Sequence, residues 1–324
     1  MNKKYLIYNV LAVFLMTSTP SFSMNGSFFR LARVAGATAV PCIALLLTIN
    51  EKEQLKKSVN RNNRSIRTVL RPKEAILVEE WFLEKKEQVN TPNLETVLLV
   101  FGPEWGSIRN NTQGRVLVSS ADLTELSAAL VAKLENEKMT DWSAHQNNMT
   151  LAKHSMILGH ELGHIANNDD LNRLYARASI PVGVELALFG ITSKFKELCR
   201  ISPPKKFIET VLRSSLAVGA IGPKLLISLS LFWTYCRYRE TQADRFSCEN
   251  AKSRLELEVF ADIFRKYSVA EGTRKPGVLA WLIHMLSDAE HPYSADRVKI
   301  VEGYLTQWDV KHADNSSVAE TIRS

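Results

Sequence analysis

The sequence has only four cysteines in 324 residues and contains no C-x-x-C pair. Small secreted domains held by disulfides have dense, regularly spaced cysteines, and thiolate zinc sites use closely spaced pairs. Neither pattern is present. The sequence therefore excludes a disulfide scaffold and a cysteine-based zinc site. It predicts ordinary thiols at Cys42, Cys199, Cys236 and Cys248.

The sequence also lacks an uninterrupted apolar run of roughly 18 or more residues, the length typical of a membrane-spanning helix. Residues 5–16 form an apolar run behind two lysines, and the small-x-small pattern at residues 21–23 follows it. This arrangement is typical of a signal peptide. A second run, residues 34–49, is interrupted by Pro41. Its length and composition fit a membrane anchor and a buried helix equally well.

Two later apolar regions, residues 178–191 and 216–235, each contain a charged side chain. Glu185 lies in the first region and Lys224 in the second. Because an ionisable group is costly inside a membrane, neither region is a clean span. The pattern slightly favours a buried helical hairpin over one that dips into a membrane.

Strong basic character is absent outside one segment. Residues 51–73 carry eight lysines and arginines against two glutamates, which accounts for six of the net +7 charges. The rest of the chain is close to neutral, so the charge does not indicate a nucleic-acid partner. The basic segment fits a stretch beside a membrane that is attracted to anionic headgroups, or a solvated linker.

Hydrophobic periodicity predicts a mainly α chain with a small β-sheet, an α+β fold. Two short apolar strands are expected to form a hairpin or a sheet edge, and residues 135–148 are expected to be irregular. Asp122 and Glu125 have the spacing of a capping box at the start of a helix. The predicted helices are 74–89, 122–134 and 150–166, and the predicted strands are 96–101 and 115–119.

The third of these helices carries His160-Glu161-Leu162-Gly163-His164. Residues four apart lie one turn above each other on a helix, so both imidazoles can bind one zinc ion. Glu161 is rotated by about 100° from His160, where it can reach a metal-bound water without being a ligand. The motif therefore predicts a zinc hydrolase with Glu161 as the catalytic base.

A catalytic zinc needs a third protein ligand and an open position for water. The residue three after His164 is Asn167, so the metzincin continuation is absent. Glu185 and Glu240 both follow at a distance. Glu240 is favoured because Asp244 stands one turn further along the same polar segment, where it can accept a hydrogen bond from a liganding histidine.

The combination of motifs resembles the gluzincin peptidases of the HtpX and CAAX prenyl protease type, the forty-eighth metallopeptidase family. The three motifs are H-E-L-G-H, R-x-x-E-x-x-A-D at residues 237–244 and H-P-x-x-x-x-R at residues 291–297. The resemblance covers about residues 95–305. It implies a zincin-type metallopeptidase domain with an HExxH active-site helix and one Zn²⁺ per chain. It also implies that His291 or Arg297 lies near the cleft, stabilising the oxyanion or capping the zinc.

The same resemblance assigns a role to residues 114–120, as an edge strand that pairs with an extended substrate. Residues 135–148 look like an insertion relative to the family and could cover the cleft. The expected domain boundaries are 1–23 for a signal peptide or signal anchor, 24–73 for a hydrophobic segment followed by a basic linker, 74–306 for the zinc metallopeptidase domain and 307–324 for a polar tail.

The sequence thus predicts a zinc-dependent endopeptidase that cleaves proteins or peptides in quality control of the cell envelope. Membrane association is expected, with the domain either exported or anchored on the cytoplasmic side. The alternative is a catalytically silent zinc-binding chaperone or assembly factor. A membrane-anchored adaptor leaves the histidine and glutamate motif unexplained.

Overall fold

The computed structural model describes residues 65–89, 95–100, 105–110, 113–135, 140–198, 221–272, 292 and 294–321. The chain divides into two compact units. The larger unit comprises Leu55–Asn172 and Cys236–Ser324, and the smaller unit comprises Met1–Gln54 and Arg173–Tyr235. The predicted mainly helical fold with a small sheet is confirmed. Residues 5–16 and 34–49, which carry the expected signal peptide and second apolar run, lie outside the described ranges.

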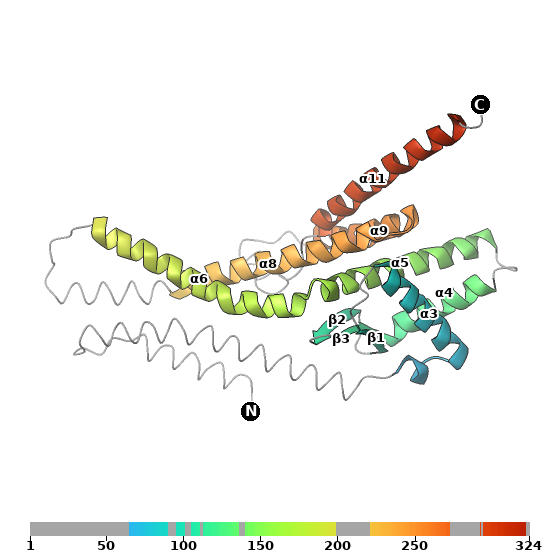
Figure 1. Cartoon of the computed structure of the whole chain (residues 1–324), viewed down its shortest axis with the longest axis horizontal. Helices are drawn as coiled ribbons and strands as arrows, with labels where there is room; N and C mark the ends of the chain where they lie inside the picture. Colours follow the sequence, from blue (N-terminus) through green and yellow to red (C-terminus); the bar gives the residue numbers. More distant parts are fainter. Residues whose placement is uncertain are drawn as a thin grey trace. The chain divides into compact units, whose positions relative to one another are not determined.

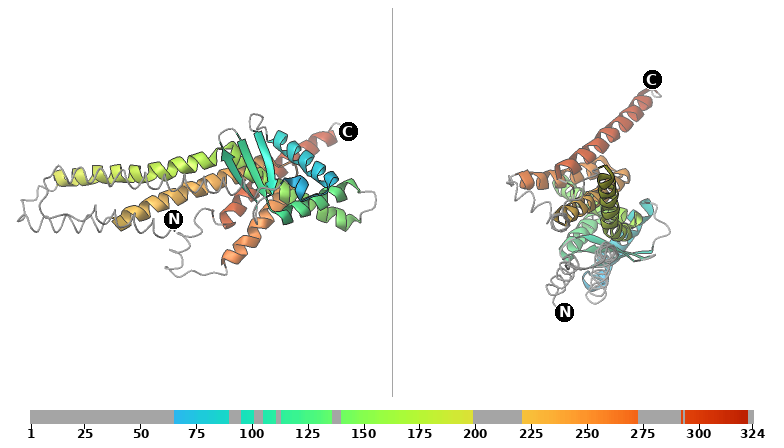
Figure 2. Two further views of the ribbon diagram at one scale, coloured as in Figure 1. Left: turned by 90° about the horizontal axis from the view of Figure 1, so that it is seen from below. Right: turned by 90° about the vertical axis from the view of Figure 1, so that its left-hand side faces the viewer.

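The sheet in the larger unit has three strands, β1 (Glu95–Val100), β2 (Gly106–Asn110) and β3 (Gln113–Val118). Their order is β1-β3-β2, with β1 parallel and β2 antiparallel to β3 (Figure 2). The expected hairpin between the first and last strands is therefore wrong. β1 pairs with β3 in parallel, and β2 is the strand that pairs with β3 in the antiparallel sense.

The central position of β3 also corrects the expectation of an edge strand at residues 114–120. Leu98 lies opposite Val116 on one side of β3, and Ser107 lies opposite Val116 on the other. Both edges of β3 are thus already paired, and it cannot accept a substrate strand. Within the described part of the sheet, the outer strands are β1 and β2, and β2 packs against the helix α5.

The larger unit also contains the 3-10 turn η1 (Ile66–Thr68) and five helical segments. These are α3 (Pro72–Gln88), α4 (Ser120–Leu134), α5 (Asp141–Ala166), α9 (Arg254–Gly272) and α11 (Ser294–Thr321), together with the last part of α8 (Ile221–Glu249). The helices predicted over 74–89 and 122–134 are confirmed within a few residues at each end. Helix α11 continues past residue 306, where the domain was expected to end.

Two helix starts differ from the prediction. Helix α4 is capped by Ser119, whose Oγ accepts a hydrogen bond from the Asp122 amide at 3.0 Å, so the cap lies three residues earlier than expected. Helix α5 begins at Asp141 with Thr140 as its cap, and residues 141–148 form its first two turns. The expected irregular insertion over residues 135–148 is therefore mostly helix.

Helix α5 packs against α4 and α9 (Figure 1). Two hydrophobic clusters of the larger unit hold it. Leu158, Leu162 and Ile165 pack into a cluster with the sheet, α3 and α4. Met156 belongs to a second cluster with residues of α8, α9 and α11. Because apolar contacts hold the helix on both sides, its polar side chains near the C-terminal end occupy fixed positions.

Two glycines of α5 allow α8 to approach closely. A Cβ atom at Gly163 would lie 3.2 Å from the Ala243 Cα atom and 3.1 Å from the Phe246 ring, and one at Gly159 would lie 2.8 Å from Ser247 Oγ. Ser247 Oγ also donates a 2.7 Å hydrogen bond to the Met156 carbonyl. The absence of side chains at both glycines therefore fixes the spacing of α5 and the last turns of α8.

The described part of the smaller unit consists of α6 (Asp169–Leu198) from Arg173 onward and α8 up to Tyr235. The guanidinium carbon of Arg177 lies 5.0 Å from the centre of the Phe232 ring, so the two helices lie side by side here. Among the described helices, none has the length and hydropathy needed to cross a membrane. The connection across residues 199–220 lies outside the described ranges, so the choice between the two predicted kinds of hairpin stays open.

Two of the four cysteines predicted to be ordinary thiols lie in the described part of the chain. Cys236 and Cys248 are both buried, and neither forms a disulfide, as expected. Cys42 and Cys199 lie outside the part of the chain that the structure describes.

A buried carboxylate ties three helices of the larger unit together. Glu256 of α9 accepts hydrogen bonds from Lys85 of α3 at 2.9 Å, from Ser155 of α5 at 2.5 Å and from the Lys252 amide at 2.5 Å. Burial raises the pKa of Glu256, but the bonds from Ser155 and Lys85 outweigh this and the pKa is lowered overall. The ionised form is therefore the one that the fold stabilises, and this contribution is lost as the pH falls through the folded-state pKa.

We predict that Glu256→Ala lowers the free energy of unfolding of the larger unit by about 3–5 kcal/mol, because it leaves the Lys85 ammonium buried and unpaired. Glu258→Ala is the matched control on the same helix. Its partner Arg254 and Glu258 itself are half exposed, so we expect a change within about 0.5 kcal/mol. Urea unfolding followed by tryptophan fluorescence measures both values, and equal losses in the two variants would contradict the assignment.

Candidate metal centre

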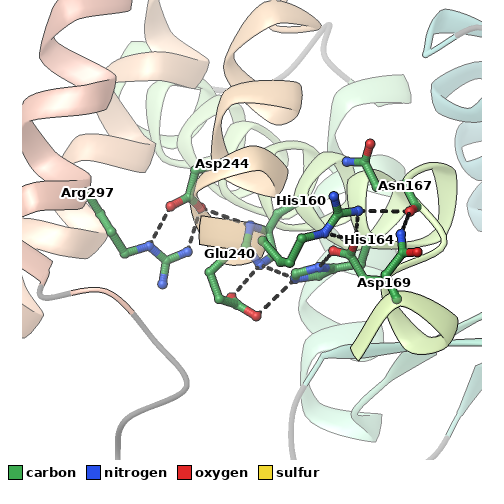
Figure 3. A network of polar contacts seen from close by, with 9 residues as sticks. His160, His164, Asn167, Asp169, Glu240, Asp244 and Arg297 are labelled. Atoms are coloured by element: carbon green, nitrogen blue, oxygen red, sulfur yellow. Dashed lines mark hydrogen bonds and ion pairs between the residues drawn. The ribbon is translucent and has the colours of Figure 1, made fainter. Parts of the chain in front are cut away.

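His160, His164 and Glu240 meet at one point of the larger unit (Figure 3). The two Nε2 atoms are 3.0 Å apart, and each lies 3.4 Å from one oxygen of the Glu240 carboxylate. Glu240 comes from α8, 76 positions after His164, and its side chain is almost fully buried. The structure thus brings together the three residues that the sequence predicted as ligands.

These separations fit a zinc ion. Tetrahedral ligands that each lie about 2.0–2.1 Å from zinc are separated from one another by about 3.3 Å. Each Nδ1 atom faces a carboxylate, so we assign the ring proton to Nδ1, which turns the Nε2 lone pair toward the shared point. Two lone pairs and a carboxylate directed at one point repel each other unless a cation lies between them. Two imidazoles with a carboxylate are a donor set that suits zinc.

His160 is oriented by a chain of two further residues. Its Nδ1 atom lies 2.9 Å from Asp244 Oδ1, and Asp244 is completely buried. Arg297 of α11 donates one hydrogen bond to each Asp244 oxygen, from Nε at 2.7 Å and from Nη2 at 2.5 Å. Its guanidinium carbon also lies 4.0 Å from the centre of the Phe264 ring. Arg297 therefore positions His160 through Asp244.

His164 has an equivalent chain that the sequence reasoning missed. Its Nδ1 atom lies 2.6 Å from Oδ2 of the buried Asp169. Arg239 of α8 donates a hydrogen bond from Nε to Asp169 Oδ1 at 2.5 Å and another from Nη2 to the Asn167 carbonyl at 2.8 Å. Each histidine is thus held by an aspartate, and each aspartate is held by an arginine.

The position of Asp169 follows from how α5 ends. Asn168 adopts a positive φ of 54°, the left-handed conformation that asparagine tolerates better than most residues. The Asn167 amide still bonds to the Gly163 carbonyl, so the break between α5 and α6 is short. Asp169, the first residue of α6, thereby contacts His164. In the sequence, this arrangement is indicated by Asn167 and Asn168, which end the helix, followed directly by Asp169.

The surrounding carboxylates favour positive charge on the two imidazoles. Burial lowers the pKa of His160, but Asp244 and Glu240 outweigh it and raise that pKa to about 10. Burial likewise lowers the pKa of His164, and Asp169 and Glu240 reverse the effect. Burial raises the pKa of Asp244, whereas the charges of Arg297 and His160 bring it below its ordinary value. The site is built to hold a cation.

Glu161 lies on α5 beside the first histidine and is 9% exposed. Among the residues that the structure describes, its carboxylate makes no hydrogen bond or ion pair. Its oxygens are not among the fully buried polar atoms that lack a partner, so they remain accessible to water. This placement agrees with the predicted role as base, which stays a prediction.

Two other residues, Arg297 and His291, were predicted from the sequence to act near the cleft. The Arg297 guanidinium bonds to Asp244, which supports a role in positioning His160. Its predicted role in stabilising the oxyanion or capping the zinc stays a prediction. His291 lies outside the described residues, and so does the side chain of Glu185 on α6.

Comparison with known proteins gives one match. The sequence model for peptidase family M48 matches residues 112–305, a range that includes both histidines, Glu240, Asp244 and Arg297. The resemblance inferred from the three motifs is thereby confirmed. No curated protein and no solved structure matches the chain.

We predict that Asp169→Asn lowers zinc affinity or activity by about 10–100-fold, as is typical when the residue that orients a metal-binding histidine is changed. Asp262→Asn, at an exposed ion pair with Arg265 on α9, should leave zinc affinity unchanged. Competition with a fluorescent zinc chelator measures the affinity of the folded protein. An unchanged affinity in Asp169→Asn would show that Asp169 does not orient His164.

Proposed function

Because the chain belongs to peptidase family M48 and is therefore a zinc metallopeptidase, we propose that it is an endopeptidase that cleaves protein substrates in quality control of the cell envelope. The observation that carries the proposal is the convergence of His160, His164 and Glu240 on one point, with Glu161 buried beside them. We propose that this site holds one Zn²⁺.

When bound, zinc polarises the scissile carbonyl and lowers the pKa of a water molecule to about 7. Glu161 then accepts the proton of the attacking water and passes it to the leaving amine. Its carboxylate suits this role because no protein donor competes for it in the described part of the chain. Asp244 and Asp169 keep the two histidines in the tautomer that presents Nε2 to the metal.

Glu161 also argues against a silent zinc-binding scaffold. A purely structural zinc site uses four protein ligands and closes the coordination sphere. Among the described residues, three ligand residues converge, and the Glu161 carboxylate stands next to them without being part of the cluster. An arrangement with three ligands and an adjacent base favours hydrolysis.

The proposed location in the cell envelope is supported by the sequence alone. The apolar run at residues 5–16 has the pattern of a signal peptide, and the basic residues 51–73 follow a second apolar run. We propose that the protein is associated with a membrane or exported. If both apolar runs insert, the basic segment places the peptidase domain on the cytoplasmic side.

We predict that Glu161→Gln keeps the zinc and loses nearly all hydrolysis of an unfolded substrate such as casein, because the ligands are intact and only the base is removed. Glu240→Gln should lose activity together with zinc, whose affinity should fall at least about tenfold. Glu185→Gln is the control and should retain both. Hydrolysis by the wild-type protein should stop on chelation. Retained activity in Glu161→Gln would assign the base elsewhere, and loss of zinc only in Glu185→Gln would overturn the ligand set.

We predict that the mature protein begins near residue 24, because the small-x-small pattern at residues 21–23 fits a signal peptidase site. N-terminal sequencing of the protein recovered from fractionated cells tests this. A mature chain that still begins at Met1 and sediments with membranes would show that the first apolar run is an anchor and is not removed.

A further inference from the structure

A second group of potential metal ligands lies on the same helix as the catalytic histidines. Asp122 and Glu125 of α4 and His154 of α5 each place one ligand atom within 4.8 Å of the others. The proposed catalytic reaction does not use any of the three. His154 precedes His160 by six positions, which is about 9 Å along the helix.

His154 is the unusual member of this group. Its side chain is completely buried, and neither ring nitrogen has a hydrogen-bond partner in the described part of the structure. Glu125 Oε2 lies 3.4 Å from Nε2 without the alignment of a hydrogen bond, and the Trp105 ring packs against the imidazole with its centre 5.8 Å away. A buried imidazole whose nitrogens lack well-aligned partners is costly, so its presence calls for a ligand.

The two carboxylates of this group, Asp122 and Glu125, lie on the neighbouring helix α4. Ser119 Oγ donates a 2.6 Å hydrogen bond to Asp122 Oδ2, which fixes that side chain and leaves Oδ1 available. Lys153 Nζ lies 2.9 Å from Glu125 Oε2 and 4.0 Å from Asp122 Oδ1. The Lys153 side chain is one-third exposed, so it can turn into solvent when another cation enters.

We propose that Asp122, Glu125 and His154 form a second zinc site. The group offers one nitrogen and two carboxylate ligands, and an imidazole ligand favours zinc over magnesium or calcium. With Lys153 turned away, the two negative carboxylates match the charge of a divalent ion. Since this side of the cluster is open to solvent at Glu125, the remaining coordination positions can be filled by water.

The protonation state of His154 is compatible with this role. Burial lowers the pKa of His154, and the neighbouring Lys153 lowers it further, while Glu125 and Asp122 act in the opposite direction. The imidazole is therefore neutral at physiological pH, and a neutral imidazole is the form that binds metals.

Zinc at this position joins α4 to α5. The site is weaker than the catalytic one, because Glu125 is half exposed and Lys153 competes for the carboxylates. Its occupancy therefore follows the zinc concentration, and it stabilises the helix that carries His160 and His164. A higher zinc concentration therefore stabilises α5, the helix of the active site, through this second site.

The test uses the full chain carrying Glu161→Gln, which prevents self-cleavage. Zinc bound per chain is measured by equilibrium dialysis against a series of zinc buffers. The parent should bind two zinc ions, one tightly and one weakly. Adding His154→Phe should abolish the weak binding and leave the tight binding unchanged. The matched control His145→Phe changes an exposed histidine on the same helix and should leave both in place.

Two further variants separate this proposal from the catalytic assignment. Asp122→Asn should weaken the second zinc at least about tenfold, as loss of a charged ligand does. Glu240→Gln should weaken the tight zinc only. A parent that binds one zinc, or a His154→Phe variant that still binds two, overturns the second site. Loss of both zinc ions in Glu240→Gln overturns the independence of the two sites.

Thermal unfolding supplies a second measurement. In the presence of a chelator, His154→Phe should be at least as stable as the parent, because it replaces a buried imidazole whose nitrogens lack partners. Zinc in excess of the tight site should raise the melting temperature of the parent and of His145→Phe, but not that of His154→Phe. An equal rise in all three proteins contradicts the proposal.

Discussion

The close approach of α5 and α8 at Gly159 and Gly163 is the constraint on which the metal centre depends. A methyl group at Gly163 would lie 3.2 Å from the Ala243 Cα atom, so a side chain at this position would push the two helices apart by a few tenths of an ångström. Glu240 and Asp244 lie on the same stretch of α8 as Ala243, and this contact places them beside His160 and His164. The glycine inside the H-E-L-G-H motif therefore determines where the third ligand lies, although it touches no metal.

The sequence predicts a part of the site well where the residues involved lie close together in the chain, and poorly where they lie far apart. Helix geometry grouped His160 with His164 and Glu240 with Asp244, and the need of zinc for a third ligand joined the two pairs. Asp169 lies only five positions after His164, but their contact depends on the positive φ of Asn168. Arg239 was missed because its bond to Asp169 joins segments 70 positions apart. The bond of Arg297 was missed for the same reason. Its bond to Asp244 depends on the packing of α11, which no local pattern encodes.

The errors in the fold have a related cause. Strand β2 has the sequence Gly-Ser-Ile-Arg-Asn, which carries little strand signal. It follows β1 in the sequence and pairs with β3 in the antiparallel sense, whereas β1 and β3 are parallel and form no hairpin. Residues 141–148 are polar and lie on an exposed part of α5, where apolar periodicity is absent and only the Thr140 cap marks the helix start. The strands and helices with strong apolar patterns were found, and pairing order and polar helix ends were not.

The charges of the metal centre explain why zinc and protons compete for it. Glu161, Glu240, Asp244 and Asp169 are buried carboxylates, and Arg297 and Arg239 compensate two of them. The remaining two negative charges equal the charge of one divalent ion. Burial lowers the pKa of His160, but Asp244 and Glu240 outweigh it and raise that pKa to about 10, so a proton supplies positive charge when the ion is absent. Zinc must displace this proton in order to bind, so its affinity falls as the pH is lowered.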